Sequence, residues 1–282
     1  MLGWVRLLCA FLFLLCACQP LPEVGVEPPY APVAHTAGVR VVVAGMRSPE
    51  GAEPYRAFLK GLEEHLGERV EAFGRRTYAE VLEALRRGEA EMGFLCTLAA
   101  GLGVEEGFLD VVLAGETLVP YQSLIVVAEA SPYRELAELR GMPFAFTDPL
   151  SNTGHAWPRL LARGLGEDFF ARAFFTYSHD RALEAVLGGL AEGAAVDRVV
   201  YESLGVRGLR VVAQGPVDPP PPVVVPRDLD PKLRSRLVRA LLRHGATPQG
   251  QKALGALGLR GFRPAEEEPY RAVFQRAKEV LP

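Results

Sequence analysis

Short apolar runs alternate with helical patterns along most of this 282-residue chain, and this alternation restricts the fold more than any other feature. The apolar runs occupy residues 39–44, 70–73, 92–95, 109–114, 121–128, 144–146, 173–176, 193–197, 211–213 and 223–225. The helical patterns cover residues 54–66, 77–87, 182–190, 231–244, 248–257 and 264–280. Strands separated by helices are typical of α/β proteins, so we expect parallel-core sheets flanked by helices.

Two places in the chain are suited to crossing from one sheet to another. The long apolar strand at 121–128 can leave one lobe and enter the next, and the prolines at 219–222 separate two short strands as a return crossing. Two crossings predict a bilobal protein with a two-strand hinge. Its discontinuous first lobe would consist of residues 38–120 and 216–282, and its inserted second lobe of residues 121–215. Ligands of open α/β sheets lie beyond the carboxyl ends of the strands, so we expect the site between the lobes.

The segment 144–155, with the sequence FAFTDPLSNTGH, has the features of an anion-binding site. An apolar strand and an Asp-Pro turn lead into three small polar residues, Ser151, Asn152 and Thr153, and Gly154 then opens a helical pattern. The first N–H groups of a helix have no partner within it and carry partial positive charge, so hydroxyl and amide groups beside them can surround an oxyanion. The same residue types are ordinary helix N-caps, which is the alternative interpretation.

A second polar cluster follows another apolar run. Ser178 and His179 stand at the start of an amphipathic helix, and this unit closes with a small-residue strand that ends in Asp197. A lone histidine at a helix start is commonly a cap or a surface residue. A binding role for His179 therefore depends on the motifs around it.

Five segments, taken in order, resemble the phosphate-, phosphite- and phosphonate-binding periplasmic proteins of ABC importers. They are 121–127 (YQSLIVV), 138–141 (ELRG), 148–154 (DPLSNTG), 178–180 (SHD) and the strand that ends at Asp197. The order and spacing match over residues 39–260. The resemblance implies the type II periplasmic-binding fold, in which two lobes close about a hinge on a ligand.

This resemblance also implies where the ligand is bound. In the family, the polar loop donates to the anion, a histidine at the position of His179 does the same, and a first-lobe tyrosine at the position of Tyr78 lines the cleft. Thr97 ends a first-lobe strand and can line the cleft, whereas Tyr121, Gly154 and Asp197 belong to the matching segments. The expected ligand-binding residues are Ser151, Asn152, Thr153, Gly154, His179, Tyr78, Thr97, Tyr121 and Asp197.

Some positions depart from the family pattern. Leu95 replaces a tyrosine, and aminoalkylphosphonate binders carry carboxylates at two positions that fall on Val199 and Pro221 here. Asp197 lies close by and either caps the next helix or, if the alignment is shifted by two residues, meets an amine. Arg47 is either a charge partner for the anion or a solvated surface residue. We therefore expect no dedicated amine pocket, no cofactor, and a small or apolar-substituted ligand: phosphite, phosphate or a short alkylphosphonate.

The amino terminus has the pattern of an export signal. Residues 2–18 are almost wholly apolar, too short for a comfortable membrane span, and fit a secretory signal peptide at 1–18. The end of this stretch, LCAC, resembles the bacterial lipobox, which predicts a lipid on Cys18; an unlipidated signal or a short anchor helix is the alternative. The proline-rich residues 19–37 are typical of an extended tether. We expect an exported protein anchored to a membrane by lipid.

Composition excludes several classes of function. Apart from Cys9, Cys16 and Cys18 near the amino terminus, Cys96 is the only cysteine, so no disulfide framework is expected, and no Cys/His spacing indicates a metal site. The net charge of -3 gives no electrostatic case for binding nucleic acid.

We expect a monomeric extracytoplasmic solute-binding lipoprotein that delivers a phosphorus oxyanion to an ABC permease–ATPase complex, and not an enzyme. Ser178 and His179 are sequence neighbours, which is poor geometry for a catalytic triad, and no nucleophile elbow, Walker loop, zinc-protease motif or dinucleotide fingerprint is present. An oxyanion-sensing accessory protein for a membrane kinase is the alternative, followed by a small-carboxylate enzyme on the same fold.

Overall fold

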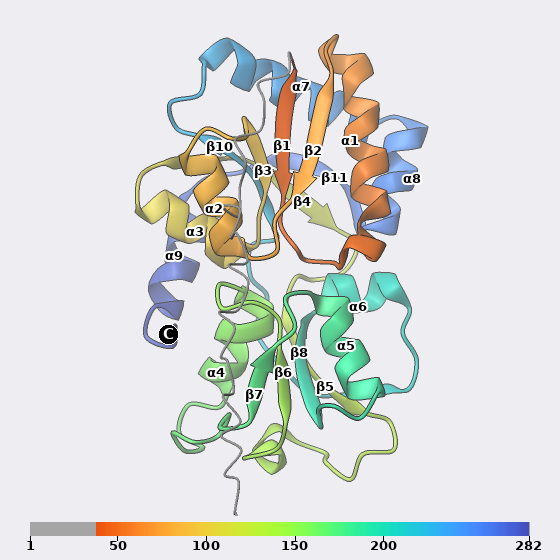
Figure 1. Ribbon diagram of the computed structural model, residues 1–282, viewed down its shortest axis with the longest axis vertical. Helices are drawn as coiled ribbons and strands as arrows, with labels where there is room; N and C mark the ends of the chain where they lie inside the picture. Colours follow the sequence, from red (N-terminus) through yellow and green to blue (C-terminus); the bar gives the residue numbers. More distant parts are fainter. Residues whose placement is uncertain (1–37, 282) are drawn as a thin grey trace, which may run out of the picture. The chain divides into compact units, whose positions relative to one another are not determined.

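The computed structural model describes residues 38–281 and contains two β-sheets, each with helices packed against it (Figure 1). The first sheet has six strands, in the spatial order β11 (Leu259–Pro264), β4 (Leu109–Thr117), β10 (Pro222–Pro226), β3 (Met92–Phe94), β1 (Val39–Val43) and β2 (Val70–Gly74). β2, β1 and β3 run parallel, whereas β10 is antiparallel to both β3 and β4. The carboxyl ends of the three parallel strands therefore lie at one edge of the sheet.

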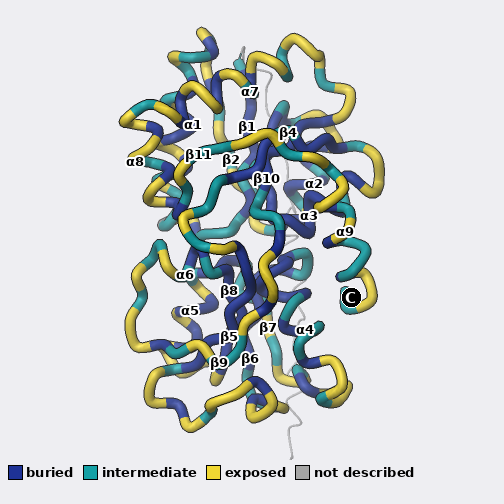
Figure 2. Tube along the Cα trace, turned by 180° about the vertical axis from the view of Figure 1, so that it is seen from behind, coloured by how far each residue is buried: buried dark blue, intermediate teal, exposed yellow. Residues whose placement is uncertain are grey.

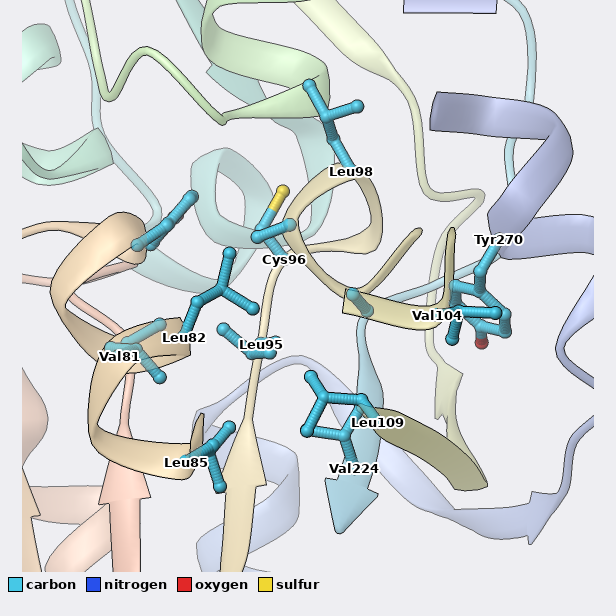
Figure 3. Packing of buried hydrophobic residues seen from close by; sticks show 14 of the residues in the cluster. Val81, Leu82, Leu85, Leu95, Cys96, Leu98, Val104, Leu109, Val224 and Tyr270 are labelled. Carbon is cyan, nitrogen blue, oxygen red and sulfur yellow. The ribbon is translucent and has the colours of Figure 1, made fainter. Parts of the chain in front are cut away.

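Helices cover both faces of the first sheet, and together they form the first lobe. One layer consists of α1 (Glu53–Leu66), α7 (Pro231–Gly245) and α8 (Pro248–Ala256), and the other of α2 (Tyr78–Arg86), α3 (Thr97–Glu105) and α9 (Glu268–Ala277). Successive residues of a strand face opposite sides, so Val41 packs with Phe58 of the first layer and Val42 with Leu85 of the second. Figure 3 shows side chains of α2, α3 and α9 meeting in the buried hydrophobic cluster beneath this second layer.

The second sheet has five strands and forms the second lobe with its own helices. The strands follow the spatial order β7 (Ala173–Phe175), β6 (Phe144–Phe146), β8 (Gly193–Asp197), β5 (Ser123–Ala128) and β9 (Leu209–Gln214). β7, β6 and β8 run parallel, and β5 is antiparallel to both β8 and β9. α5 (His179–Leu187) and α6 (Arg198–Leu204) pack on one face and α4 (Trp157–Leu161) on the other. Figure 2 shows that the central strands of both sheets are mostly buried.

The chain passes between the two sheets twice. It leaves β4 for β5 through residues 118–122 and returns from β9 to β10 through residues 215–221. The predicted α/β fold, with parallel-core sheets and a two-strand hinge, is confirmed. All described residues fall within one compact unit.

Three elements differ from the sequence prediction. Residues 259–264, most of which the sequence prediction left unassigned between two helices, form β11 at the edge of the first sheet. Gly258 adopts φ +76° and ends the preceding helix. The last helix is correspondingly shorter than predicted. α3 was not predicted because it is buried on nearly all sides, so its sequence lacks the apolar period of an amphipathic helix.

The predicted signal peptide at 1–18, with Cys18, and the proline-rich segment at 19–37 lie outside the described residues. None of the helices between residues 38 and 281 has the length and apolar character needed to cross a membrane. Within the same residues, Cys96 is a buried free thiol.

Candidate functional site

Three parallel strand ends position the polar residues of the second lobe. Thr147 follows β6, Ser178 and His179 follow β7, and Asp197 is the last residue of β8. These strands are neighbours, so their carboxyl ends meet at one edge of the sheet, where ligands of α/β proteins bind. Each of the four residues is at most 3% exposed.

The predicted anion loop forms a single π-helical turn, η3 (Asn152–Ala156), between β6 and α4. Helical structure begins at Asn152, two residues before the predicted start, because Ser151 is the N-cap. The Gly154 N–H donates to Ser151 Oγ at 3.0 Å. Ser151 thus fulfils the capping interpretation of the sequence, whereas the side chain of Thr153 takes no part in the cap.

Buried polar atoms without a hydrogen-bond partner gather around this turn. They are Thr147 Oγ1, Asn152 Oδ1, Thr153 Oγ1 and Ser178 Oγ. Ser178 Oγ makes no hydrogen bond of good geometry. It lies near the Asp180 carboxylate and helps to lower the pKa of Asp180, which burial alone would raise. An unpaired buried polar group costs about 1–3 kcal/mol, so such groups are rare in native proteins. Several in one cluster indicate a place where a polar ligand completes the hydrogen bonds.

His179 is a neutral hydrogen-bond donor. Its Nδ1 accepts from the Asp197 N–H at 3.0 Å, so the proton of the neutral ring is on Nε2. Burial lowers the pKa of His179 to about 4; Arg47 lowers it further, and Asp180 opposes both. At neutral pH the ring therefore offers Nε2–H to a ligand without carrying charge.

Asp197 caps α6, as one interpretation of the sequence predicted. Its Oδ1 accepts from the Val199 N–H at 2.7 Å. Burial raises the pKa of Asp197 to about 7, against the lowering effect of these helix N–H groups and of Arg47. The carboxyl is thus partly protonated at neutral pH, which weakens it as a counter-ion for an amine.

A small, mostly apolar cavity lies beside Asp197. Its volume is about 30 Å³, and Leu95, Val199 and Pro221 are among the residues that line it. Those are the positions at which the sequence departs from aminoalkylphosphonate binders. A cavity of this size holds about two water molecules or a short apolar substituent.

The first lobe contributes residues at the carboxyl ends of β2 and β3. Tyr78 begins α2 and Thr97 begins α3, and both are almost fully buried. Burial raises the pKa values of Tyr78 and Tyr121 well above that of free tyrosine, so both hydroxyls stay neutral. Thr97 Oγ1 donates to the Pro219 carbonyl at 2.8 Å and holds the crossing segment. The Tyr121 hydroxyl lies 3.9 Å from the sulfur of Cys96, which is labelled in Figure 3.

Hydrogen bonds join the loops of the two lobes at this site. The N–H and Oγ of Ser48, after β1, donate to the Asp180 carboxylate at 3.0 and 2.5 Å. The Tyr78 N–H donates to Asp148 Oδ2 at 3.1 Å, and burial raises the pKa of that carboxyl to about 6. Strand-end loops from both sheets are thus in direct contact around the unpaired hydroxyls.

The side chain of Asn152 is tied to the return crossing. Asp218 Oδ2 accepts from Asn152 Nδ2 at 2.8 Å, from Trp157 Nε1 at 2.5 Å and from Arg276 Nη2 at 2.7 Å. The amide nitrogen that the sequence offered as an anion donor is therefore occupied. Asn152 anchors the polar loop to the hinge, and its Oδ1 is an acceptor rather than a donor.

Sequence reasoning missed two features of the site. Thr147 was treated as part of the strand leading to the turn, although its place at a strand end could have identified it. Arg47 is half-buried and connects the two lobes, because its Nη2 donates to Ser203 Oγ at 2.6 Å and to the Ala256 carbonyl at 3.0 Å.

Comparison with known protein families assigns the chain to one of them. The family described as "ABC transporter, phosphonate, periplasmic substrate-binding protein" matches residues 41–270. The chain belongs to this family. Its members are the substrate-binding components of transporters, which confirms the resemblance found in the sequence.

Known proteins of this kind are similar along most of their length. The phosphonates-binding periplasmic protein of Escherichia coli is 22% identical over 242 residues, covering 80% of this chain and 71% of that protein. A binding protein component of an ABC phosphonate transporter from Pseudomonas aeruginosa has a TM-score of 0.76 at 20% identity and covers 84% of each chain. PhnD1 from Prochlorococcus marinus, solved with methylphosphonate, has a TM-score of 0.76 at 17% identity, covering 86% of this chain and 97% of that one. The fold is thus the bilobal type II periplasmic-binding fold.

Proposed function

We propose that this family member binds a short alkylphosphonate between its two lobes and presents it to an ABC permease and ATPase. The first lobe comprises residues 38–120 and 216–282, and the second comprises residues 121–215. The observation that carries the proposal is the group of buried hydroxyls without partners on Thr147, Thr153 and Ser178. Phosphite and phosphate share the same oxygen geometry and belong to the proposed ligand class.

The donor set suits a tetrahedral oxyanion. A phosphonate has three oxygens that accept hydrogen bonds, and the three hydroxyls together with the neutral Nε2–H of His179 supply donors from three adjacent strand ends. Each hydrogen bond to a charged group contributes about 1.5–3 kcal/mol, so a few of them support the roughly 8 kcal/mol of micromolar binding. A catalytic role for His179 is not proposed, since its Nδ1 accepts from a backbone N–H and no carboxylate orients the ring as in a triad.

The substituent on phosphorus is apolar in this proposal. Val199 and Pro221 line the small cavity, and the Asp197 carboxyl beside them is engaged with the N-terminus of α6. Burying an ammonium group there without a full counter-charge costs several kcal/mol. We infer that alkyl groups of one or two carbons are preferred over aminoalkyl groups.

Calorimetry of the purified protein with matched ligands tests this function. Ethylphosphonate is expected to bind at least about tenfold more tightly than aminoethylphosphonate, a difference of about 1.4 kcal/mol, and sulfate and malonate are expected not to bind measurably. Tighter binding of aminoethylphosphonate, lost in Asp197→Asn, would overturn the proposed selectivity and identify Asp197 as the counter-ion.

Two variants connect binding with the unpaired hydroxyls. Thr153→Val should weaken ethylphosphonate binding by about 1.5–3 kcal/mol and leave the ligand-free melting temperature nearly unchanged, because no protein hydrogen bond is lost. Ser151→Ala should instead destabilise the free protein by about 1 kcal/mol, because the Gly154 N–H loses its cap. The exposed hydroxyl of Ser235 provides a control, and Ser235→Ala should change neither property. Wild-type affinity in Thr153→Val would place the anion elsewhere.

We further propose that the protein is exported and that Cys18 carries a lipid, with residues 19–37 as a tether. The support is the LCAC sequence that ends the apolar stretch. Cys18→Ser is expected to move the protein from the membrane fraction to the soluble extracytoplasmic fraction. Mass spectrometry of the mature amino terminus checks the result, and an unmodified terminus at Gln19 or beyond would contradict lipidation.

A further inference from the structure

A second and much larger cavity begins on the other side of Ser178. Its volume is about 520 Å³, within the range of small-molecule sites and far more than a methyl or ethyl group fills. It extends from Tyr177 and Ser178 of the second lobe along the ends of β1 and β2 to α1, and its floor includes the apolar side chains of Val43 and Leu59. Of the residues that hold the phosphonate in the proposed function, Ser178 also lines this space, whereas Thr147, Thr153 and His179 do not.

Positive charge surrounds this cavity. Its described lining residues include five arginines, Arg47, Arg56, Arg75, Arg76 and Arg181. Arg56 pairs with Glu53 and Arg75 with Glu89, both at 3.0 Å. Among the side chains that the structure describes, neither Arg47 nor Arg76 forms an ion pair with a carboxylate.

The hydrogen-bond partners of Arg47 and the ring partner of Arg76 are uncharged. Arg47 donates to the Ser203 hydroxyl and a backbone carbonyl, and the guanidinium of Arg76 lies 4.4 Å from the centre of the Tyr177 ring. The described lining of the cavity therefore carries an excess of positive charge, in a protein whose net charge is -3. Low-dielectric walls around such charge concentrate the field and attract anions.

Tyr177 connects this cavity to the unpaired hydroxyls. It has φ +61°, the only left-handed backbone angle of a non-glycine residue within residues 38–281. Its N–H donates to the Thr147 carbonyl at 2.8 Å, which fixes Ser178 beside Thr147, while its ring lies under Arg76. Strained residues of this kind persist mainly at functional sites. The same strained turn thus borders both the proposed phosphonate site and the arginine-lined cavity.

We propose that the 520 Å³ cavity takes a second acidic group of the ligand, so that phosphonates with an acid at the end of a short alkyl chain bind best. The inference rests on the proposed function. The cavity beside Asp197 has room for only one or two carbons, so a longer chain must leave the phosphonate on the Ser178 side, where the larger cavity opens. Val43 and Leu59 suit the alkyl spacer, and the guanidinium groups suit a carboxylate or a second phosphonate.

An acid in this position also favours contact between the lobes. Arg181 belongs to the second lobe, and the other four arginines belong to the first. An acidic group held between guanidinium groups of both lobes can bridge the lobes.

Calorimetry with matched ligand pairs tests the proposal on the full-length protein. In the wild type, 4-phosphonobutyrate and propane-1,3-diphosphonate are each expected to bind at least tenfold more tightly than butylphosphonate. The preference is expected to fall below threefold in Arg56→Gln/Arg76→Gln and to be retained in Arg56→Lys/Arg76→Lys. It should also shrink with added salt, as charge interactions do. Arg207→Gln/Arg239→Gln, which removes two exposed arginines elsewhere, is the matched control and should keep the full preference.

Methylphosphonate separates the possible failures. Its affinity should be the same in all of these proteins, which also shows that the variants are folded. If methylphosphonate binds but the acids show no advantage over butylphosphonate, or if their advantage survives in Arg56→Gln/Arg76→Gln, this inference is wrong and the proposed function stands. If no phosphonate binds the wild type, the proposed function is wrong, and this inference fails with it.

Discussion

Gly154→Ala is expected to lower phosphonate affinity at least about hundredfold. An alanine Cβ at this position would lie 1.9 Å from Thr147 Oγ1 and 2.7 Å from its Cγ2. The Thr147 N–H donates to the Gly154 carbonyl at 3.2 Å, so strand end and loop are held together and cannot separate without losing that bond. Displacement by about 1 Å at a site of aligned donors costs about two orders of magnitude. Crowding should also reduce the free energy of unfolding by about 1–3 kcal/mol.

Calorimetry and chemical denaturation measure the two effects of this variant. Gly255→Ala is the matched control, because Gly255 lies in α8 and an alanine Cβ there would have nothing within 4 Å. That change should leave binding unaltered and stabilise the protein by up to about 1 kcal/mol, as alanine does in a helix. Wild-type affinity in Gly154→Ala would show that the loop does not hold the ligand.

For Asp197→Asn, we compare the free energy of unfolding with that of the wild type. The difference in favour of the variant is expected to grow by about 3 kcal/mol as the pH is raised from 4 to 7. Burial raises the Asp197 pKa from 3.8 to about 7, so the carboxyl's contribution to folding is complete below pH 3.8 and is lost as the pH rises to about 7. Each pH unit in this window is worth about 1.4 kcal/mol. Asparagine removes this decline with pH.

His179→Gln is expected to have the opposite effect on the same curve. Burial lowers the His179 pKa from 6.5 to about 4, so its contribution is complete above pH 6.5 and is lost as the pH falls to about 4. In the wild type the two contributions largely cancel between pH 4 and 6.5. Glutamine removes only the histidine contribution. The free energy of unfolding of the variant, relative to that of the wild type, should therefore fall by about 3 kcal/mol as the pH is raised from 4 to 7.

Denaturant unfolding at intervals from pH 4 to pH 7 measures these differences. Other carboxyls, including Asp148, contribute equally to all the proteins, so each variant is read against the wild type. Asp228→Asn, at an exposed position, should follow the wild-type curve. Parallel curves for the wild type and both site variants would show that Asp197 and His179 are not buried as the structure has them.

Much of the fold is encoded locally and could be predicted. A capping box at Thr77 and Glu80 starts α2 within the predicted helical pattern at 77–87, and the alternation of strands and helices gives the two sheets with their parallel cores. α3 could not be found because burial on nearly all sides erases the amphipathic period that identifies a helix. β11 depends on pairing with β4, about 150 residues earlier in sequence, which no local pattern shows.

Some residues of the candidate site could likewise be predicted from the sequence, whereas the roles of others could not. The motifs located Ser151, Thr153 and His179, because strand ends and helix starts are visible in a sequence. The partner of Asn152 is Asp218, 66 residues away, so its anchoring role required the folded structure. The charge state of His179 likewise follows from burial, which is a tertiary property.

A crystal structure of the protein grown with methylphosphonate tests the central claim most directly. We expect the phosphonate oxygens within about 2.5–3.2 Å of Thr147 Oγ1, Thr153 Oγ1, Ser178 Oγ and His179 Nε2, so that the buried hydroxyls gain their missing partners. A phosphonate bound elsewhere on the protein, with these hydroxyls still unpaired, would contradict the account.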